Sequence, residues 1–362
     1  MNTAVPDPYV IEGSLPDRYP RGWFCIGADY EFTTKPTKLD YFGTSLVAYR
    51  GQETGQLHIL DAYCPHMGAN LAGDGSQVVG ESVICPFHHW SWGADGFCNH
   101  IPYANKIPAR ARIKSWPVVE QNQLVFVWHD PDGGPPLPEQ EIPRDEEVFE
   151  ETYTPWVIQR VIVESNCREL IDNMADKAHF GPVHGSQSIN LFQNISEGHR
   201  YTQLMNGSSP MGDMESEATY HGPGYMLHRL THHLVTGETS KFMSLVMNVP
   251  TSMESFEFLA GFKYPIPPGM QGNPMAQIAY VRQLMEENHQ GVFADLAIWK
   301  DKAVIDNPIL CDGDGPVTKL RQWYNQFLVP VDEVPAATRE RKEYDKSQPI
   351  TFNPVPVAGP TH

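Results

Sequence analysis

The sequence lacks long apolar runs and has few basic residues for its size. No stretch of the 362 residues approaches the roughly 18 apolar residues of a membrane-spanning helix. The start, MNTAVPDPYVIEG, has neither the basic end nor the apolar core of a secretory signal. With 26 basic and 44 acidic residues, the formal charge is −18, which argues against nucleic acid or an anionic membrane as the main partner. We therefore expect an acidic cytoplasmic protein without a membrane span.

Cysteine is also scarce, and its six copies are scattered along the chain. This spacing argues against a disulfide scaffold and leaves metal ligands or buried thiols as the alternatives. The chain is long enough for two domains, although one large domain is also compatible with its length. The six residues are Cys25, Cys64, Cys85, Cys98, Cys167 and Cys311.

The first third of the chain has the pattern of a small all-β module. Up to about Asp130, short β-branched and aromatic runs such as SVICPFH are separated by Gly, Asn and Asp. The segment DPDGGPPLPEQEIP that follows is too rich in proline and glycine for a helix or a central strand, so it predicts a domain boundary. We place the first domain, with its N-terminal extension, at residues 1–132 and the second at residues 133–362.

The second domain mixes strands and helices. VIQRVIVESN and several alternating segments after it predict antiparallel strands. CRELIDNMADKAHF has apolar residues three and four apart, which predicts a helix that Gly181 and Pro182 end. EENHQGVFADLAIWKDKAV, residues 286–304, and VTKLRQWYNQFLVP, residues 317–330, predict two more helices. The whole chain is therefore predicted to be of the α+β class.

Two short motifs each pair a cysteine with a histidine. Cys64-x-His66 and Cys85-x-x-His88 can bring two thiolates and two imidazoles to a common centre. A Cys2His2 zinc site is one alternative. The other is a [2Fe-2S] cluster with both thiolates on one iron and both imidazoles on the other, because each loop mixes the two ligand types. Imidazoles in place of thiolates make the cluster less negative and raise its reduction potential.

His89 is a rival to His88 as a ligand. The two-residue interval between Cys85 and His88 lets their side chains converge, so we expect His89 to face solvent or to donate a hydrogen bond. Cys98 belongs to neither motif and is predicted to be inert.

A second candidate centre lies in DNMADKAHFGPVHG. On a helix Asp176 and His179 share one face. Gly181 and Pro182 would break that helix and let His184 turn back toward His179. Two satisfied or surface histidines are the alternative. With a carboxylate, the pair would form the facial triad of a non-haem iron(II) oxygenase, which leaves positions open for dioxygen.

Several acidic residues near the C-terminus could supply the carboxylate. The apolar stripe Val292, Leu296, Trp299 and Ala303 of the expected helix also contains Asp295, so Asp295 is predicted to face inward. Asp301 falls on another face and is predicted to be solvated. The other candidates considered are Glu286, Glu287 and Asp306.

At these motifs the chain resembles the Rieske non-haem iron oxygenases. The resemblance is carried by CPHMGANL, CPFHHWSW and DKAHFGPVH, in that order. Within this group the chain is most similar to the oxygenase components of 3-ketosteroid 9α-hydroxylases, through GFCNHIPYANKIPARARIKSWP, SNCRELIDNMADKAHF and SEATYHGPGYM. The resemblance implies an all-β Rieske [2Fe-2S] domain joined to a catalytic domain with an antiparallel sheet flanked by helices.

The resemblance also implies roles for individual residues. Asp176 would bridge to a cluster histidine of a neighbouring subunit in a homotrimer, and Asn173 would lie beside the iron. The [2Fe-2S] cluster would be bound by Cys64, His66, Cys85 and His88, and the mononuclear Fe(II) by His179, His184 and Asp295.

The activity implied is hydroxylation of a steroid-like substrate by dioxygen. Electrons would come from NADH through a separate flavin and iron-sulfur reductase, because the chain contains no nucleotide-binding fingerprint. A basic cluster, Lys106, Arg110, Arg112 and Lys114, is either a docking site for that reductase or an ordinary solvated strand face. Two alternatives stay open: another hydroxylation, demethylation or desaturation of a hydrophobic ring, and a plain electron carrier. The segment GPV after Phe180 and parts of the catalytic domain depart from similar hydroxylases.

Overall fold

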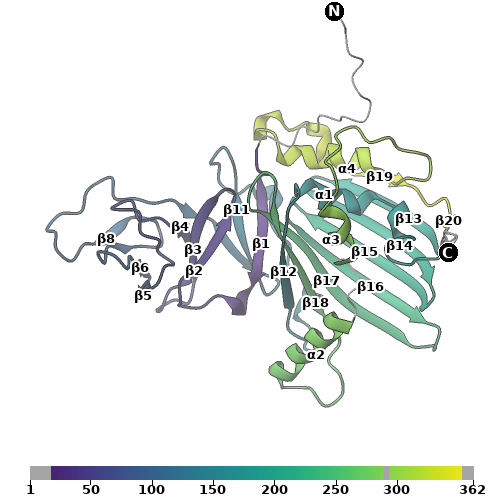
Figure 1. The fold of residues 1–362 in the computed structure, drawn as a ribbon, viewed down its shortest axis with the longest axis horizontal. Helices are drawn as coiled ribbons and strands as arrows, with labels where there is room; N and C mark the ends of the chain where they lie inside the picture. Colours follow the sequence, from purple (N-terminus) through teal and green to yellow (C-terminus); the bar gives the residue numbers. More distant parts are fainter. Residues whose placement is uncertain (1–17, 288–292, 353–362) are drawn as a thin grey trace, which may run out of the picture.

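The strands form four antiparallel sheets, three small ones early in the chain and one large sheet after them (Figure 1). The structure is a computed structural model that describes residues 18–287 and 293–352. In Figure 1 the small sheets fill one half of an elongated molecule, with β1 and β11 beside the large sheet, and the large sheet with its helices fills the other half.

The three small sheets confirm the predicted all-β module. Their strand orders are β1-β11-β10, β2-β3-β4-β9 and β5-β6-β7-β8. The strands are β1 (Gly22–Ala28), β2 (Thr37–Tyr41), β3 (Thr44–Arg50), β4 (Leu57–Asp61), β5 (Gln77–Val79), β6 (Ser82–Ile84), β7 (Ser91–Trp92), β8 (Cys98–His100), β9 (Ser115–Trp116), β10 (Val118–Gln121) and β11 (Leu124–His129).

The segment between the small sheets and the large sheet is irregular. Residues 130–143 contain a single 3₁₀ turn, Pro138–Gln140, and no strand, and a second 3₁₀ turn follows at Glu146–Phe149. The proline and glycine content of this stretch accounts for the irregular backbone. The domain boundary at residue 132 stays a prediction.

The large sheet is built mainly from consecutive hairpins. From β13 to β18 each strand pairs with the next along the chain, and β12 and β19 pair with the two ends of this run. Alternating burial, as at Met214, Ser216, Ala218 and Tyr220 in β15, is typical of strands with one covered face. The strands are β12 (Val157–Val163), β13 (Ser188–Glu197), β14 (Arg200–Ser209), β15 (Gly212–His221), β16 (Tyr225–Leu234), β17 (Thr239–Pro250), β18 (Phe256–Lys263), β19 (Lys342–Asp345) and β20 (Ile350–Thr351), the last pairing with β13.

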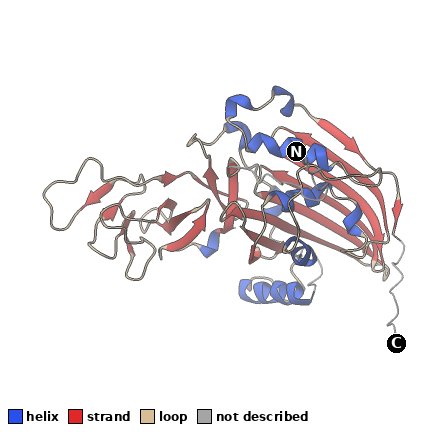
Figure 2. Ribbon diagram, turned by 45° about the horizontal axis from the view of Figure 1, so that its top comes forward, coloured by secondary structure: helices blue, strands red, loops and turns tan. Residues whose placement is uncertain are grey.

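Helices lie against the large sheet (Figure 2); they pack on one of its faces, whereas β1 and β11 of one small sheet pack on the other. On the helix side, one core joins Leu170, Trp299 and Leu320 to sheet residues. On the opposite side, Phe126 of β11 packs edge to face on Tyr225, with ring centroids 4.9 Å apart. The helices are α1 (Arg168–Asp172), α2 (Pro274–Glu287), α3 (Phe293–Trp299) and α4 (Val317–Tyr324).

The sequence overestimated two helices. The helix expected over CRELIDNMADKAHF ends as α1 and a 3₁₀ turn, Asn173–Ala175, because Asp176 has an extended backbone with φ −83° and ψ 102°. Its Oδ1 accepts the N–H groups of Ala178 and His179, which competes with helical bonding.

The helix predicted over residues 286–304 also ends earlier than expected, and residues 288–292 lie outside the described part of the chain. Helix α2 reaches Glu287, α3 ends at Trp299, and only turns follow α3 up to Lys302. Val292, part of the predicted stripe, lies outside the described residues. The last predicted helix is present as α4 with a following 3₁₀ turn, Asn325–Phe327. None of the described helices combines the length and apolarity needed to cross a membrane.

Gly224 tests the contact between the large sheet and the small sheets. A Cβ atom at Gly224 would lie 2.4 Å from a ring carbon of Phe24 and 2.9 Å from the carbonyl oxygen of Asn248. We expect Gly224→Ala to destabilise the fold by about 1–3 kcal/mol through overpacking, measured as a lower midpoint of thermal unfolding. Gly313→Ala is the control, since its nearest atom would be 3.7 Å away. Equal midpoints for the two variants would contradict this account of the interface.

Candidate metal centres

The two loops of the first centre share one backbone pattern. In each, the cysteine N–H donates to the carbonyl five residues on, from Cys64 to Ala69 and from Cys85 to Trp90, both at 2.9 Å. In each, the cysteine carbonyl accepts the N–H of the residue four positions on, Gly68 or His89. Two matching loops therefore present Cys64 and Cys85 from equivalent positions.

The histidines of the two loops meet edge to face. The ring centroids of His66 and His88 are 4.6 Å apart, and His66 stacks on Trp90 at 4.5 Å. The Nδ1 atoms of both histidines are buried and have no hydrogen-bond partner among the described residues. A buried lone pair without a partner is costly unless a metal or a donor fills the gap, so these atoms mark the side on which a cluster would lie.

The burial of the two motif cysteines also favours a role as metal ligands. Cys64 and Cys85 are each 1 % exposed. Burial raises the pKa of the Cys64 thiol to about 11, so a thiolate at this position needs a metal cation to offset its charge. Buried thiols opposite inward-facing imidazoles fit a Rieske [2Fe-2S] cluster, because that cluster takes two of each ligand type. None of the six cysteines, all of them described, forms a disulfide.

His89 lies where the other loop has a glycine. Its φ of 58° is left-handed, as is the φ of 78° at Gly68, and its side chain is exposed. The left-handed backbone separates it from His88, whose ring lies against His66. Cys98 is buried in the same small core as both motif cysteines, and burial raises the pKa of its thiol.

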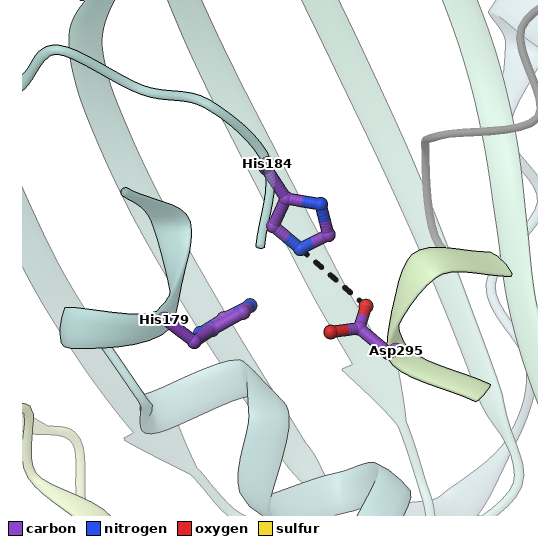
Figure 3. A group of neighbouring side chains, drawn as sticks. All are labelled: His179, His184 and Asp295. Atoms are coloured by element: carbon purple, nitrogen blue, oxygen red, sulfur yellow. Dashed lines mark ion pairs between the residues drawn. The ribbon is translucent and has the colours of Figure 1, made fainter. Parts of the chain in front are cut away.

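The second centre gathers residues more than a hundred positions apart. His179 belongs to a 3₁₀ turn, Ala178–Phe180, His184 follows it, and Asp295 projects from α3. One ligand atom of each residue lies within 4.8 Å of the others, and Figure 3 shows the three side chains turned toward a common point. Two imidazoles and one carboxylate make the donor set of a facial triad.

Hydrogen bonding fixes the orientation of His179. Its Nδ1 lies 2.6 Å from the carbonyl oxygen of Asp176, so Nδ1 carries the hydrogen and donates it. The lone pair is then on Nε2, which is buried without a partner among the described residues. This is the arrangement that metal-binding histidines show, with one nitrogen held by a carbonyl and the other free for the metal.

Asp295 is the candidate carboxylate that faces the histidines. It is 3 % exposed, and its Oδ2 lies 3.4 Å from His184 Nε2. Glu286 and Asp301 are exposed, and Asp306 is paired with Arg168 at 2.8 Å. The side chain of Glu287 lies outside the described residues.

Asp176 lies at the edge of the second centre. Its side chain is 43 % exposed and approaches His179 to 3.8 Å. Partial burial raises the pKa of this carboxyl, but the hydrogen bonds and charge of His179 outweigh burial and leave the pKa below its ordinary value. Asn173, which is half-buried, begins the preceding 3₁₀ turn, and its carbonyl accepts the Asp176 N–H.

Several residues that support the histidine loop belong to no recognisable sequence motif. Lys177 is 2 % exposed, and its Nζ donates to the carbonyls of Lys346 and Gln348 at 2.7 and 2.5 Å. The Gln203 side chain donates to the Met174 carbonyl from the sheet below. A single lysine or glutamine in the sequence cannot be distinguished from a surface residue, so only the structure identifies these supports.

Comparisons with known proteins identify the family of each part of the chain. Residues 22–117 match the Rieske [2Fe-2S] domain, and residues 127–328 match the 3-ketosteroid 9alpha-hydroxylase C-terminal domain. A probable 3-ketosteroid-9-alpha-monooxygenase oxygenase component of Rhodococcus rhodochrous is 40 % identical over 92 % of this chain and 86 % of its own. The oxygenase component of that name in Mycobacterium tuberculosis is 38 % identical over 92 % and 88 %.

A solved structure supports the fold. Dicamba monooxygenase bound to dicamba aligns with a TM-score of 0.67 at 20 % identity, covering 85 % of this chain and 97 % of that one. These matches confirm the predicted α+β class, with its Rieske and catalytic domains. They decide against a Cys2His2 zinc protein and against a plain electron carrier.

The choice between His88 and His89 can be tested directly. We expect His88→Ala to lose the [2Fe-2S] cluster and its visible absorption, because one imidazole ligand is removed. We expect His89→Gly to keep the cluster and to gain up to about 1 kcal/mol of stability, because glycine adopts a left-handed φ without steric cost. Loss of the cluster in His89→Gly alone would show that the two histidines are assigned the wrong way round.

The second centre can be tested by metal analysis. We expect His179→Ala to lose the mononuclear iron and turnover while keeping the cluster spectrum, because the two centres use separate ligands. Iron would fall from about three to about two atoms per chain. An intact iron count in His179→Ala, or a bleached cluster, would contradict the assignment.

Proposed function

The chain belongs to the family of 3-ketosteroid 9α-monooxygenase oxygenase components, and on that premise we propose that it hydroxylates a 3-keto steroid. The observation that carries this proposal is the open triad of His179, His184 and Asp295 in a chain that also holds a Rieske domain. The cluster supplies single electrons and the iron supplies activation of dioxygen.

We propose that the residues of the second centre hold iron and leave positions open for dioxygen. The Asp176 carbonyl accepts the Nδ1–H of His179 and keeps Nε2 available as a ligand. Asp295, buried on α3, supplies the anionic ligand, and three protein ligands leave positions for dioxygen. We propose that Asn173, one turn before Asp176, lies near the reacting atoms without being a ligand.

A homotrimer is part of the proposal. In Figure 1 β6, which the second cluster loop follows, lies in the half of the molecule with the small sheets, whereas α3, which bears Asp295, lies over the large sheet. Electron transfer within one chain would have to cross between these parts, whereas a neighbouring subunit could bring its cluster to the iron. Exposed apolar residues beside the cluster loops support such a contact, since an apolar patch favours burial against a partner. They are Tyr63, Met67 and Phe87, which are 53, 66 and 59 % exposed.

The electron donor is a separate reductase, as the name of the relatives, "oxygenase component", implies. We propose that it is an NADH-dependent flavin and iron-sulfur protein and that both act in the cytoplasm. Lys106, Arg110 and Arg112 are exposed and are the proposed docking cations. Lys114 is less suited, because its Nζ lies 3.5 Å from the centre of the Trp116 ring.

Turnover with a reconstituted reductase tests the function. We expect the protein to convert 3-keto steroids, with NADH and dioxygen, into products with one added hydroxyl group, identified by mass spectrometry and NMR. A demethylated or desaturated product would assign another reaction of the same oxygenase group. If the reductase reduces the cluster but no steroid of the panel is consumed, the steroid proposal is wrong.

Asp176→Asn tests the proposed bridge between subunits. The amide keeps the size of the side chain but loses its charge, so we expect both metals to remain and turnover to fall by about 100-fold. Stopped-flow measurement should show that the reductase still reduces the cluster while reoxidation of the cluster by substrate and dioxygen slows. Asp301→Asn, the same change at an exposed carboxylate, is the control. Wild-type reoxidation in Asp176→Asn would remove this residue from the electron path.

A further inference from the structure

Three polar side chains form a hydrogen-bonded row across the large sheet. His228 of β16 lies 2.9 Å through Nε2 from Ser216 of β15 and 3.0 Å through Nδ1 from Ser244 of β17. In the sheet, His228 is directly opposite Ser244 on β17 and Ala218 on β15. Ala218 is two residues from Ser216. Opposite and alternate residues share a face, so all three side chains project to the same side of the sheet.

The row lies on the face that carries the iron ligands. Ala218 and Val246, each two residues from a serine of the row, pack in the core that contains Trp299 of α3. That core lies between the sheet and the helices, and Asp295 belongs to α3.

Two contacts place the row relative to the second centre. Gln203 of β14, which supports Met174, lies two strands from His228, or about 10 Å across the sheet. Phe258 of β18 packs on Phe293 of α3 with centroids 6.1 Å apart, and Phe262, opposite Ser244, is four residues further, or about 13 Å. The row therefore lies about 10 Å across the sheet from the residue that supports Met174 and about 13 Å along it from the residue that packs on α3, distances similar to the length of a fused ring system.

The neighbours of the row are apolar and partly accessible. Leu230 lies opposite Ser216, and Phe242 lies opposite Leu230. Leu230, Phe242, Phe262 and His228 are all half-buried, whereas the two serines are 7 and 5 % exposed. A ligand on this surface would meet mainly hydrocarbon and one polar group.

The row has one hydrogen more than its internal bonds use. Burial, and secondarily the charge of His232, lowers the pKa of His228 to about 4, so the neutral imidazole has one N–H. That N–H and the two serine hydroxyls make three hydrogens, and the two bonds use two of them. Neither hydroxyl makes another hydrogen bond among the described residues, so one serine keeps a hydrogen that an acceptor can take.

We propose that this remaining hydroxyl hydrogen donates to a ketone oxygen of the bound steroid, so that Ser216, His228 and Ser244 determine specificity for a keto substrate. The proposal rests on the proposed steroid hydroxylation and deepens it. The histidine acts through the serines by holding one hydroxyl as acceptor and the other as donor. The apolar neighbours would contact the rings, and the row would fix one end of the ligand.

Binding of ketone-deleted ligands to the iron-loaded protein tests the proposal. The ligands are a steroid with ketones at both ends and two analogues in which one ketone is replaced by a methylene group, titrated by calorimetry. We expect Ser216→Ala or Ser244→Ala to weaken binding of the diketone by about tenfold. The same variant should bind the analogue that lacks the recognised ketone as tightly as wild type does.

Thr219→Val is the matched control, because Thr219 is on β15, as Ser216 is, but on the opposite face, where its hydroxyl pairs with Thr202 of β14. We expect it to bind all three ligands like wild type, and iron content should be equal in every variant. Unchanged diketone binding in both serine variants, or an equal loss for all three ligands, would overturn the recognition role while leaving the steroid function intact. Absence of steroid binding to wild type would overturn both.

Discussion

The second centre depends on two ion pairs that join α1 to the segment after α3 and to α4. Glu169, 1 % exposed, lies 2.7 Å from Lys302, just after α3, and Asp172 binds Arg321 of α4 at 2.5 Å. Removing one partner of the buried Asp172–Arg321 pair leaves an uncompensated charge, at a cost of about 3–5 kcal/mol. Because α1 leads into the histidine loop and α3 carries Asp295, these pairs hold together ligands that are distant in sequence.

The two faces of the large sheet have different roles. One face packs against the small sheets through residues such as Tyr225, and the other supports the metal loop through Gln203. Consecutive hairpins make this platform from local pairing, so its register is set by alternation and turns. Two helices on the face with the metal loop are short. Helices as short as α1 and α3 are not stable alone, so tertiary contacts stabilise them.

The parts that local pattern controls were predictable. Short strands, the irregular segment at residues 130–143 and α4 follow from alternation, proline content and helical periodicity. The two overestimated helices show the limit of periodicity. The spacing of apolar residues does not reveal that the Asp176 carboxylate caps the next turn, or that α3 stops at Trp299.

The sequence by itself determined the candidate ligands, because a metal requires particular side chains and CPH, CPFHH and the spaced histidines display them in the chain. It also indicated Asp295, since an acid within an apolar stripe must face inward. The fold confirms that His89 is exposed, and the fold was needed to show that Asp295 meets His184 and that Ser216, His228 and Ser244 join into one row. The last two outcomes depend on strand register and packing between distant segments, which no local pattern of residues specifies.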